Sequence, residues 1–195
     1  MFLTDTQAGI SSGEKRRQFS RGLEEAQCAA SVLSAPDSIA WLLNIRGSDV
    51  PNTPLALGYA VVYRSGDVDW FIDTRKIRDS IRQNLDSGIS IFPPTEFADR
   101  LALLGKSDGA VLVDPASAPE WIRLTLEAAS AALSAGTDLC ALPKARKNSA
   151  EISGTRAAHI RDGAALTTFL AWLCDAGPKG GVTEISAADY LYECR

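Results

Sequence analysis

The sequence predicts an α/β fold built on a mixed β-sheet. Short apolar or β-rich runs alternate with amphipathic helical segments over the first 142 residues, which is typical of an α/β sheet. Two of these runs are joined only by residues 64–67, which include a glycine suited to positive φ, and they predict a β-hairpin. Strands joined by so short a turn must be antiparallel, so the sheet is expected to be mixed.

Capping residues and apolar spacing place the elements of the first half of the chain. Ser11 and Ser12 are suitable N-caps for a helix whose Phe19 and Leu23 share one buried face. Ile77 and Ile81 have the four-residue spacing of another helix. The predicted elements are a helix at 11–27, a strand at 28–33, a helix at 36–43, hairpin strands at 57–63 and 68–72, a helix at 75–85 and a strand at 89–92.

The alternation continues in the second half. A proline pair opens a helix that runs to Leu104, and Gly105 is expected to end it as a C-cap with positive φ. The remaining elements predicted for the sheet domain are a strand at 109–113, a helix at 119–133 and a strand at 137–142.

The basic segment 144–147 interrupts this pattern. A long helix is predicted from Asn148 or Ser149 to Trp172, and Thr183 is the N-cap of a helix that runs to Cys194. Two consecutive helices cannot bury both of their apolar faces alone, so they are expected to begin something larger. The predicted organisation is a lead-in at 1–10, an α/β domain at 11–143 and the start of a truncated domain at 144–195.

Composition excludes several classes of protein. With 46% hydrophobic and 23% charged residues, the chain has the composition of an ordinary globular protein. Its 20 basic and 24 acidic residues are interspersed, so nucleic acid is not an expected partner. No run approaches the roughly 18 to 20 apolar residues of a membrane span, and no signal peptide is recognised at residues 1–10, so we expect a cytoplasmic protein with no membrane partner. The four cysteines are far apart and are expected to be reduced and structural.

The single histidine, His159, restricts the chemistry available to this chain. On a helical wheel it lies among Ile152, Leu166 and Leu170, which favours packing over a catalytic or metal-binding role. No cysteine or carboxylate lies four residues further on, so the pattern of two ligands on one helical face is absent.

Three aspartates lie within or at the ends of predicted strands: Asp69, Asp73 and Asp114. Paired carboxylates in such positions can hold a divalent cation, but aspartates are also common there as turn and cap residues, and we favour the latter.

The loop 44–54 is the most informative segment, because it combines charge, glycine and proline directly after an apolar helix. Arg46 and Asp49 could pair with each other to hold the turn, or one of them could face a substrate. Their spacing does not decide between these alternatives.

Three blocks of sequence, in order, resemble Xaa-Pro aminopeptidases. The segment DSIAWLLNIRGSDVP at 37–51 is similar to the second domain of that family, and the segment 147–163 is similar to the entry into its catalytic domain. The segment 178–189 is the third similar block. The resemblance implies a creatinase-N-type domain of ribonuclease H-like fold up to about residue 143. It also implies that the opening helices of a pita-bread metallopeptidase domain follow.

The activity implied by this resemblance is removal of the N-terminal residue from peptides with proline in second position, by two metal ions that are commonly manganese. The family's metal ligands lie downstream of the segment 183–189, so none can be assigned here, and the chain alone is predicted to be inactive and without a cofactor. The resemblance makes Arg46 and Asp49 candidates for shaping substrate access. The expected partner is the remainder of the peptidase chain or a homologous subunit, with peptide substrate only in the full-length enzyme.

Two other hypotheses remain open at this point. The chain could be a stand-alone binding or assembly module derived from the same family. It could also be an independent α/β protein that binds a small molecule at the carboxyl ends of its strands, although no ligand signature supports this.

Overall fold

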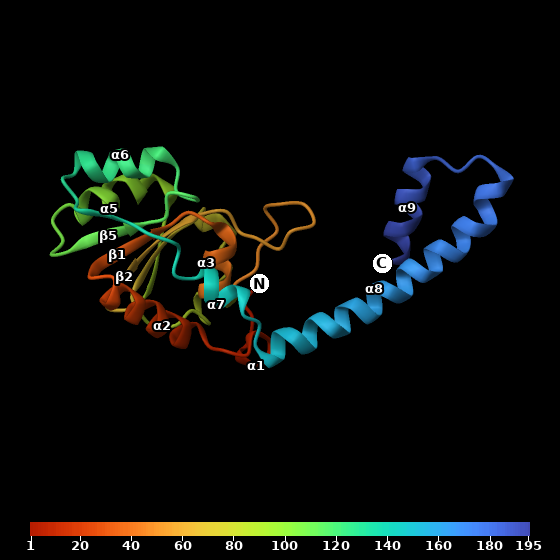
Figure 1. The fold of residues 1–195 in the computed structure, drawn as a ribbon, viewed down its shortest axis with the longest axis horizontal. Coiled ribbons are helices and arrows are strands. Elements are labelled where there is room, and N and C mark those ends of the chain that lie inside the picture. The colour runs from red at the N-terminus through yellow and green to blue at the C-terminus, as the bar shows by residue number, and fades with distance from the viewer. The chain divides into compact units, whose positions relative to one another are not determined.

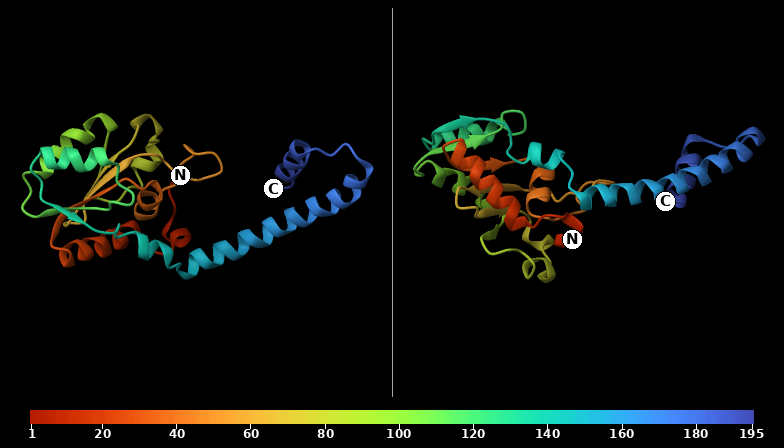
Figure 2. Two further views of the ribbon diagram at one scale, coloured as in Figure 1. Left: turned by 45° about the horizontal axis from the view of Figure 1, so that its top comes forward. Right: turned by 60° about the horizontal axis from the view of Figure 1, so that its bottom comes forward.

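A computed structural model describes the whole chain, residues 1–195, as two compact units, Met1–Lys147 and Asn148–Arg195. The first unit is built on one six-stranded sheet (Figures 1 and 2). Its strands are β1 (Cys28–Leu33), β2 (Tyr59–Tyr63), β3 (Val68–Phe71), β4 (Ile89–Phe92), β5 (Ala110–Val113) and β6 (Leu133–Ala135), in the order β4-β3-β2-β1-β5-β6. Strand β2 is antiparallel to β1 and β3, and the other neighbours are parallel. The predicted α/β class with a mixed sheet is therefore confirmed.

Helices cover both faces of this sheet (Figure 1). One face packs against α2 (Ser12–Glu25) and α3 (Pro36–Leu42), and the other packs against α5 (Phe97–Leu104) and α6 (Glu120–Ala128). The short helices of this unit are α1 (Asp5–Ala8), α4 (Asp79–Arg82), α7 (Ala141–Ala145), and the 3-10 turns η1 (Thr74–Lys76) and η2 (Pro94–Glu96).

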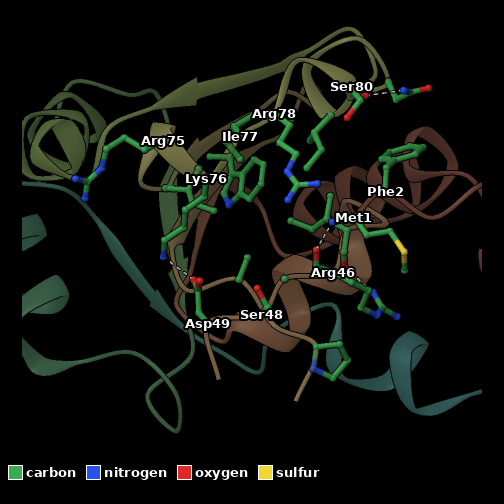
Figure 3. A pocket seen from close by; sticks show the side chains of 18 residues that line it. Met1, Phe2, Arg46, Ser48, Asp49, Arg75, Lys76, Ile77, Arg78 and Ser80 are labelled. Atoms are coloured by element: carbon green, nitrogen blue, oxygen red, sulfur yellow. Dashed lines mark hydrogen bonds and ion pairs between the residues drawn. The ribbon is translucent and has the colours of Figure 1, made fainter. Parts of the chain in front are cut away.

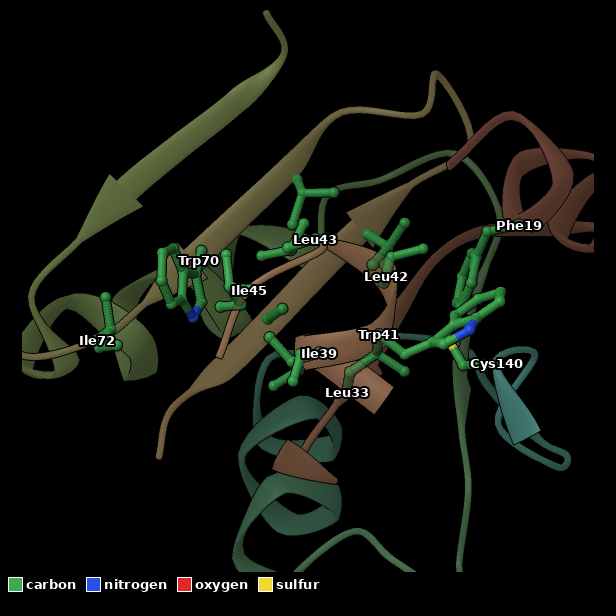
Figure 4. Packing of buried hydrophobic residues seen from close by; sticks show 14 of the residues in the cluster. Phe19, Leu33, Ile39, Trp41, Leu42, Leu43, Ile45, Trp70, Ile72 and Cys140 are labelled. Atoms are coloured by element: carbon green, nitrogen blue, oxygen red, sulfur yellow. The ribbon is translucent and has the colours of Figure 1, made fainter. Parts of the chain in front are cut away.

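Strand alternation divides the core into two apolar clusters. In β2, Ala60 and Val62 belong to the cluster beneath α2 and α3, whereas Val61 belongs to the cluster beneath α5 and α6. Figure 4 shows the first cluster, in which Trp41 from α3 and Trp70 from β3 supply the largest side chains. The sheet is thus buried on both faces, which fixes the register of its strands.

Three predicted elements of the sheet domain are wrong in extent. The helix expected at 75–85 is replaced by η1 and α4, because the Asp73 carboxylate accepts a hydrogen bond from the Arg75 backbone N–H at 3.0 Å and caps a single turn. Arg78 then takes extended backbone angles and separates the two short helices.

The helix expected at 119–133 ends at Ala128, because Ser130 has a φ of 62° and reverses the chain. The last strand is therefore β6 at 133–135, not 137–142. Where that strand was predicted, Asp138 accepts a hydrogen bond from the Cys140 backbone N–H at 2.8 Å, and this turn leads into α7.

Gly105 does not have the positive φ that was predicted, because its φ is −62°. The structure requires glycine there for a different reason. A Cβ atom at this position would lie 1.9 Å from the Ala129 carbonyl oxygen, so the turn after α5 lies directly against the end of α6.

The second unit consists of α8 (Ser149–Ala176), the turn η3 (Gly177–Lys179) and α9 (Glu184–Cys194). Helix α9 packs back on α8 through stacking of Trp172 on Tyr190, at 4.2 Å between ring centroids, and through an ion pair between Arg195 and Asp162. Capping boxes at Asn148 and Thr183 begin the two helices, as their N-cap residues predict.

The prediction that His159 packs in an apolar stripe is wrong. His159 is exposed, as are Ile152, Leu166 and Leu170. Its Nδ1 lies 2.9 Å from the Thr155 carbonyl oxygen within the same helix. These side chains are therefore not covered within this unit. None of the helices combines the length and the apolar character needed to cross a bilayer.

Candidate functional site

A cleft of about 880 Å³ lies beside the loop that follows α3 (Figure 3). Three parts of the first unit line it: the N-terminal residues Met1 and Phe2, the loop between α3 and β2, and the segment from the end of β3 to α4. Both residues that were singled out from the sequence, Arg46 and Asp49, are among the lining residues. The fold therefore brings the predicted loop to a concave surface.

The loop on this cleft is closed by its own backbone. The Gly47 N–H donates to the Pro54 carbonyl at 3.2 Å, and the Asp49 N–H donates to the Leu55 carbonyl at 3.0 Å. A Cβ atom on Gly47 would lie 2.6 Å from the Ala56 nitrogen, so only glycine allows the two arms of the loop to come this close. These contacts hold the arms in a fixed arrangement.

Asp49 joins this loop to the segment after β3. Its carboxylate lies 2.7 Å from Lys76 Nζ and accepts a hydrogen bond from the Leu57 backbone N–H at 2.8 Å. The hydrogen bond from Lys76, followed by the one from Leu57, holds the pKa of Asp49 below its usual range. Asp49 thus forms its ion pair with Lys76 across the cleft, a partner that neither of the two alternatives considered from the sequence included.

Arg46 has a different set of contacts. One guanidinium nitrogen donates to the carbonyls of Ala40 at 3.2 Å and Ile45 at 2.7 Å, so the side chain ties the loop to the end of α3. Its backbone N–H also donates to the Met1 carbonyl at 2.7 Å. A role of Arg46 and Asp49 in substrate access stays a prediction.

A buried lysine anchors the start of the loop. Lys15 of α2 is 3% exposed, and its Nζ donates to the Asn44 side-chain oxygen at 2.6 Å and to the Trp41 carbonyl at 2.9 Å. The ammonium group also lies 4.4 Å from the centre of a Trp41 ring. Asn44 has a φ of 53°, a conformation that asparagine tolerates better than most residues, and it turns the chain from α3 into the loop.

Sequence reasoning missed the opposite wall of the cleft, which carries Arg75, Lys76 and Arg78. These residues lie more than 20 positions beyond the end of the loop in sequence, and only the pairing of β2 with β3 brings them to it. The available signal was the concentration of basic residues between 75 and 82, which the prediction of a single amphipathic helix concealed.

Asp73 and Asp114 have the cap and turn roles that were predicted, whereas Asp69 lies within β3 and instead binds side chains. Asp69 accepts a hydrogen bond from the Tyr63 hydroxyl at 2.7 Å, and burial, aided by this bond, raises the pKa of Tyr63. The Arg75 guanidinium lowers the pKa of Asp73 to about 2 through a 2.7 Å ion pair. Asp114 accepts hydrogen bonds from the backbone N–H groups of Ala116 and Asp138, each at 2.9 Å.

These assignments bear on the two-metal cluster that the resemblance implies. No group of three or more His, Cys, Asp or Glu side chains in the chain is placed to hold a metal ion. The residues of this chain therefore do not fit a dinuclear metal site.

Comparison with known proteins identifies the fold. A family model described as the creatinase/prolidase N-terminal domain matches residues 1–151. The crystal structure of X-prolyl aminopeptidase from Caenorhabditis elegans, described as a cytosolic enzyme with a di-nuclear active site, superposes with a TM-score of 0.89 at 30% identity. It covers 100% of this chain, which corresponds to 32% of that chain. Xaa-Pro dipeptidase from Bacillus anthracis shares the fold at 17% identity, with a TM-score of 0.70 over 94% of this chain and 48% of that one.

Curated relatives agree with the structural match. A probable Xaa-Pro aminopeptidase P of Paracoccidioides lutzii is 36% identical over 96% of this chain and 32% of its own length. Xaa-Pro aminopeptidase 1 of Dictyostelium discoideum is 37% identical over 88% of this chain and 27% of its own. This chain spans about a third of the length of the relatives it matches. It belongs to the creatinase/prolidase N-terminal domain family and is homologous to one part of the Xaa-Pro aminopeptidases.

Proposed function

We propose that this chain is a non-catalytic portion of an Xaa-Pro aminopeptidase and has no peptidase activity alone. The observation that carries the proposal is 36% identity with a probable Xaa-Pro aminopeptidase P over 96% of the chain but only 32% of the relative. The full-length form would remove the N-terminal residue from peptides with proline in second position, with two divalent metal ions, manganese by analogy with the family. Because this chain offers no ligand set for them, the metals would be held by the remainder of the enzyme.

A direct assay tests this proposal. The purified chain is incubated with Mn²⁺ and a peptide that begins Xaa-Pro, and release of the first residue is measured beside the full-length C. elegans enzyme as a positive control. We expect no turnover above background. Turnover that co-purifies with the chain and disappears on addition of EDTA would refute the proposal.

We assign residues 11–143 to the creatinase-N-like domain and 144–195 to the beginning of the pita-bread catalytic domain. Exposed apolar side chains on both α8 and α9, with Ile160 at 75% and Ile185 at 75% exposure, support this assignment, because the helices of a complete domain bury most such side chains. The partner that would cover it is the rest of the peptidase chain or a homologous subunit. The site of action would be the cytosol, as for the C. elegans relative.

In the complete enzyme, the loop that carries Arg46 and Asp49 would border the path of the peptide to the metal site. A chimera tests this, in which the matching third of the C. elegans enzyme is replaced by this chain. We expect the chimera to cleave Xaa-Pro peptides, and Arg46→Gln and Asp49→Asn to raise KM more than they lower kcat. If both parameters stay unchanged in both variants of an active chimera, the access role is wrong.

The same exposed apolar side chains are also compatible with the second candidate, a stand-alone binding or assembly module of this family. Size-exclusion chromatography of the chain, alone and mixed with a full-length homologue, separates the two. Co-elution with the homologue at equimolar ratio favours the module. If the chain elutes independently, and activity is seen only when it is fused in the chimera, the result favours the proposal that the chain is a portion of a peptidase.

A further inference from the structure

We propose that the cleft between the 45–56 loop and α4 binds an organic carboxylate that carries an apolar group, such as a short peptide with a free C-terminal carboxylate. This goes beyond the proposed function, because it concerns a ligand that the present chain binds alone. The volume of about 880 Å³ lies within the roughly 300–1,000 Å³ typical of small-molecule pockets.

Apolar side chains supply a surface for the non-polar part of such a ligand. Phe2, Pro54, Ala56 and Ile81 line the cleft and remain partly or fully exposed, so a ligand can reach them. Behind them, Trp70 and Ile72 are each 1% exposed and belong to the packed core, which makes the floor rigid. Burial of this apolar surface would favour binding of a ligand with a hydrophobic side chain.

The charges on the cleft are unequal. Four of its lining side chains are cationic, namely Arg46, Arg75, Lys76 and Arg78, and Asp49 is the one lining carboxylate. Asp49 pairs with Lys76, and Arg75 pairs with Asp73 outside the lining. The cleft therefore has an excess of positive charge, which attracts an anion.

Arg78 is the residue placed to receive that anion. Figure 3 shows its side chain extending from the rim near α4 into the hollow, toward the N-terminal residues and the loop, whereas the Arg75 side chain points away from it. The guanidinium of Arg78 has no carboxylate within ion-pair distance in the structure. A guanidinium offers paired N–H donors that match the two oxygens of a carboxylate.

The charge distribution favours a carboxylate over a phosphate group. Two of the four cations form ion pairs with Asp49 and Asp73, which lowers the net positive charge that the cleft presents to a dianion. The Asp49 carboxylate on the opposite wall would also repel a dianion more strongly than a monoanion. A singly charged carboxylate with an adjacent apolar group can use both the positive charge and the apolar lining of the cleft.

NMR titration of the ¹⁵N-labelled chain tests the proposal. The probes are N-acetyl-leucyl-leucine, its C-terminal amide, which keeps the apolar groups but lacks the charge, and inorganic phosphate. We expect saturable shifts of the backbone signals at 45–49 and 76–84 with the free acid. The amide is expected to bind about tenfold more weakly, since a charge-assisted hydrogen bond is worth at least one such factor.

Two arginine variants complete the test. Arg78→Gln should weaken binding of the acid about tenfold, whereas Arg82→Gln, an exposed arginine of α4 that does not line the cleft, should leave it unchanged. Both side chains are exposed, and the dispersion of the amide signals checks that each variant is folded. Equal affinity for acid and amide, equal loss in both variants, tighter binding of phosphate, or absence of saturable shifts with the acid would overturn the proposal.

Discussion

Replacement of Lys15 by methionine is expected to destabilise the first unit and to loosen the loop that carries Arg46. Lys15 is buried, and its ammonium group is the donor to the Asn44 side-chain oxygen and to the Trp41 carbonyl. Methionine has a similar length and fills the space, but it cannot donate. Asn44 is only 1% exposed, so its side-chain oxygen would lose its charged partner and could not bind water in its place.

The expected cost follows from opposing contributions. Each of the two hydrogen bonds that the ammonium group donates contributes about 1.5–3 kcal/mol, and the contact with the Trp41 ring adds about 1 kcal/mol. Removal of a buried charge recovers a few kcal/mol of desolvation energy, so the net loss is about 2 kcal/mol. With a slope of about 2 kcal/mol per molar urea, the unfolding midpoint should fall by about 1 M.

Urea unfolding followed by tryptophan fluorescence measures this change, because Trp41 lies beside the substituted residue. Lys106→Met, at an exposed lysine, is the matched control and should stay within about 0.5 kcal/mol of the parent chain. A cycle with Asn44→Ala should give a coupling energy above about 0.5 kcal/mol. An unchanged or higher midpoint in Lys15→Met would refute the reasoning, since desolvation would then outweigh the hydrogen bonds.

Two further predictions concern particular contacts. Gly105→Ala should lower the free energy of unfolding by about 1–3 kcal/mol, because its Cβ would collide with the Ala129 carbonyl. Gly154→Ala, whose Cβ would have no atom within 4 Å, should stabilise α8 by up to about 1 kcal/mol. Thermal unfolding followed by circular dichroism compares the two variants. Asp49 has a lowered pKa, so its ion pair contributes stability above the unfolded pKa of about 3.9 and loses it as the pH falls through the folded value. Carboxyl ¹³C titration should place the Asp49 midpoint higher in Lys76→Met than in the parent; equal midpoints would contradict the assigned cause.

Local signals in the sequence predicted most strands correctly. The strands at 28–33 and 89–92 have the predicted bounds, because each is a short apolar run between turn residues. The hairpin around 64–67 also formed as predicted, with Gly66 at a φ of 86°. Errors arose where a side chain caps a turn inside an apparently periodic segment, as Asp73 does before α4. Periodicity measures which face is apolar, and it carries no information on such competing hydrogen bonds.

The candidate site was predictable only in part. The composition of the loop pointed to Arg46 and Asp49, and both line the cleft. Their partners could not be predicted, because Lys76 meets Asp49 only after β2 and β3 have paired. The anchor Lys15 was also missed, since a lysine within an amphipathic helix is usually assigned to the solvated face.

The parallel pairing of β1 with β5, which are far apart in sequence, has a consequence for synthesis of the chain. Residues 28–33 pair in parallel with residues 110–113, so about 80 residues must be made between the two partners. At roughly 5–20 residues per second, this interval lasts about 4–16 s. The hairpin can form on one side of β1 during that time, but the other edge of β1 stays unpaired and open to other chains. We expect the nascent protein to depend on chaperones or slow growth for a soluble yield, independently of the stability of the finished fold.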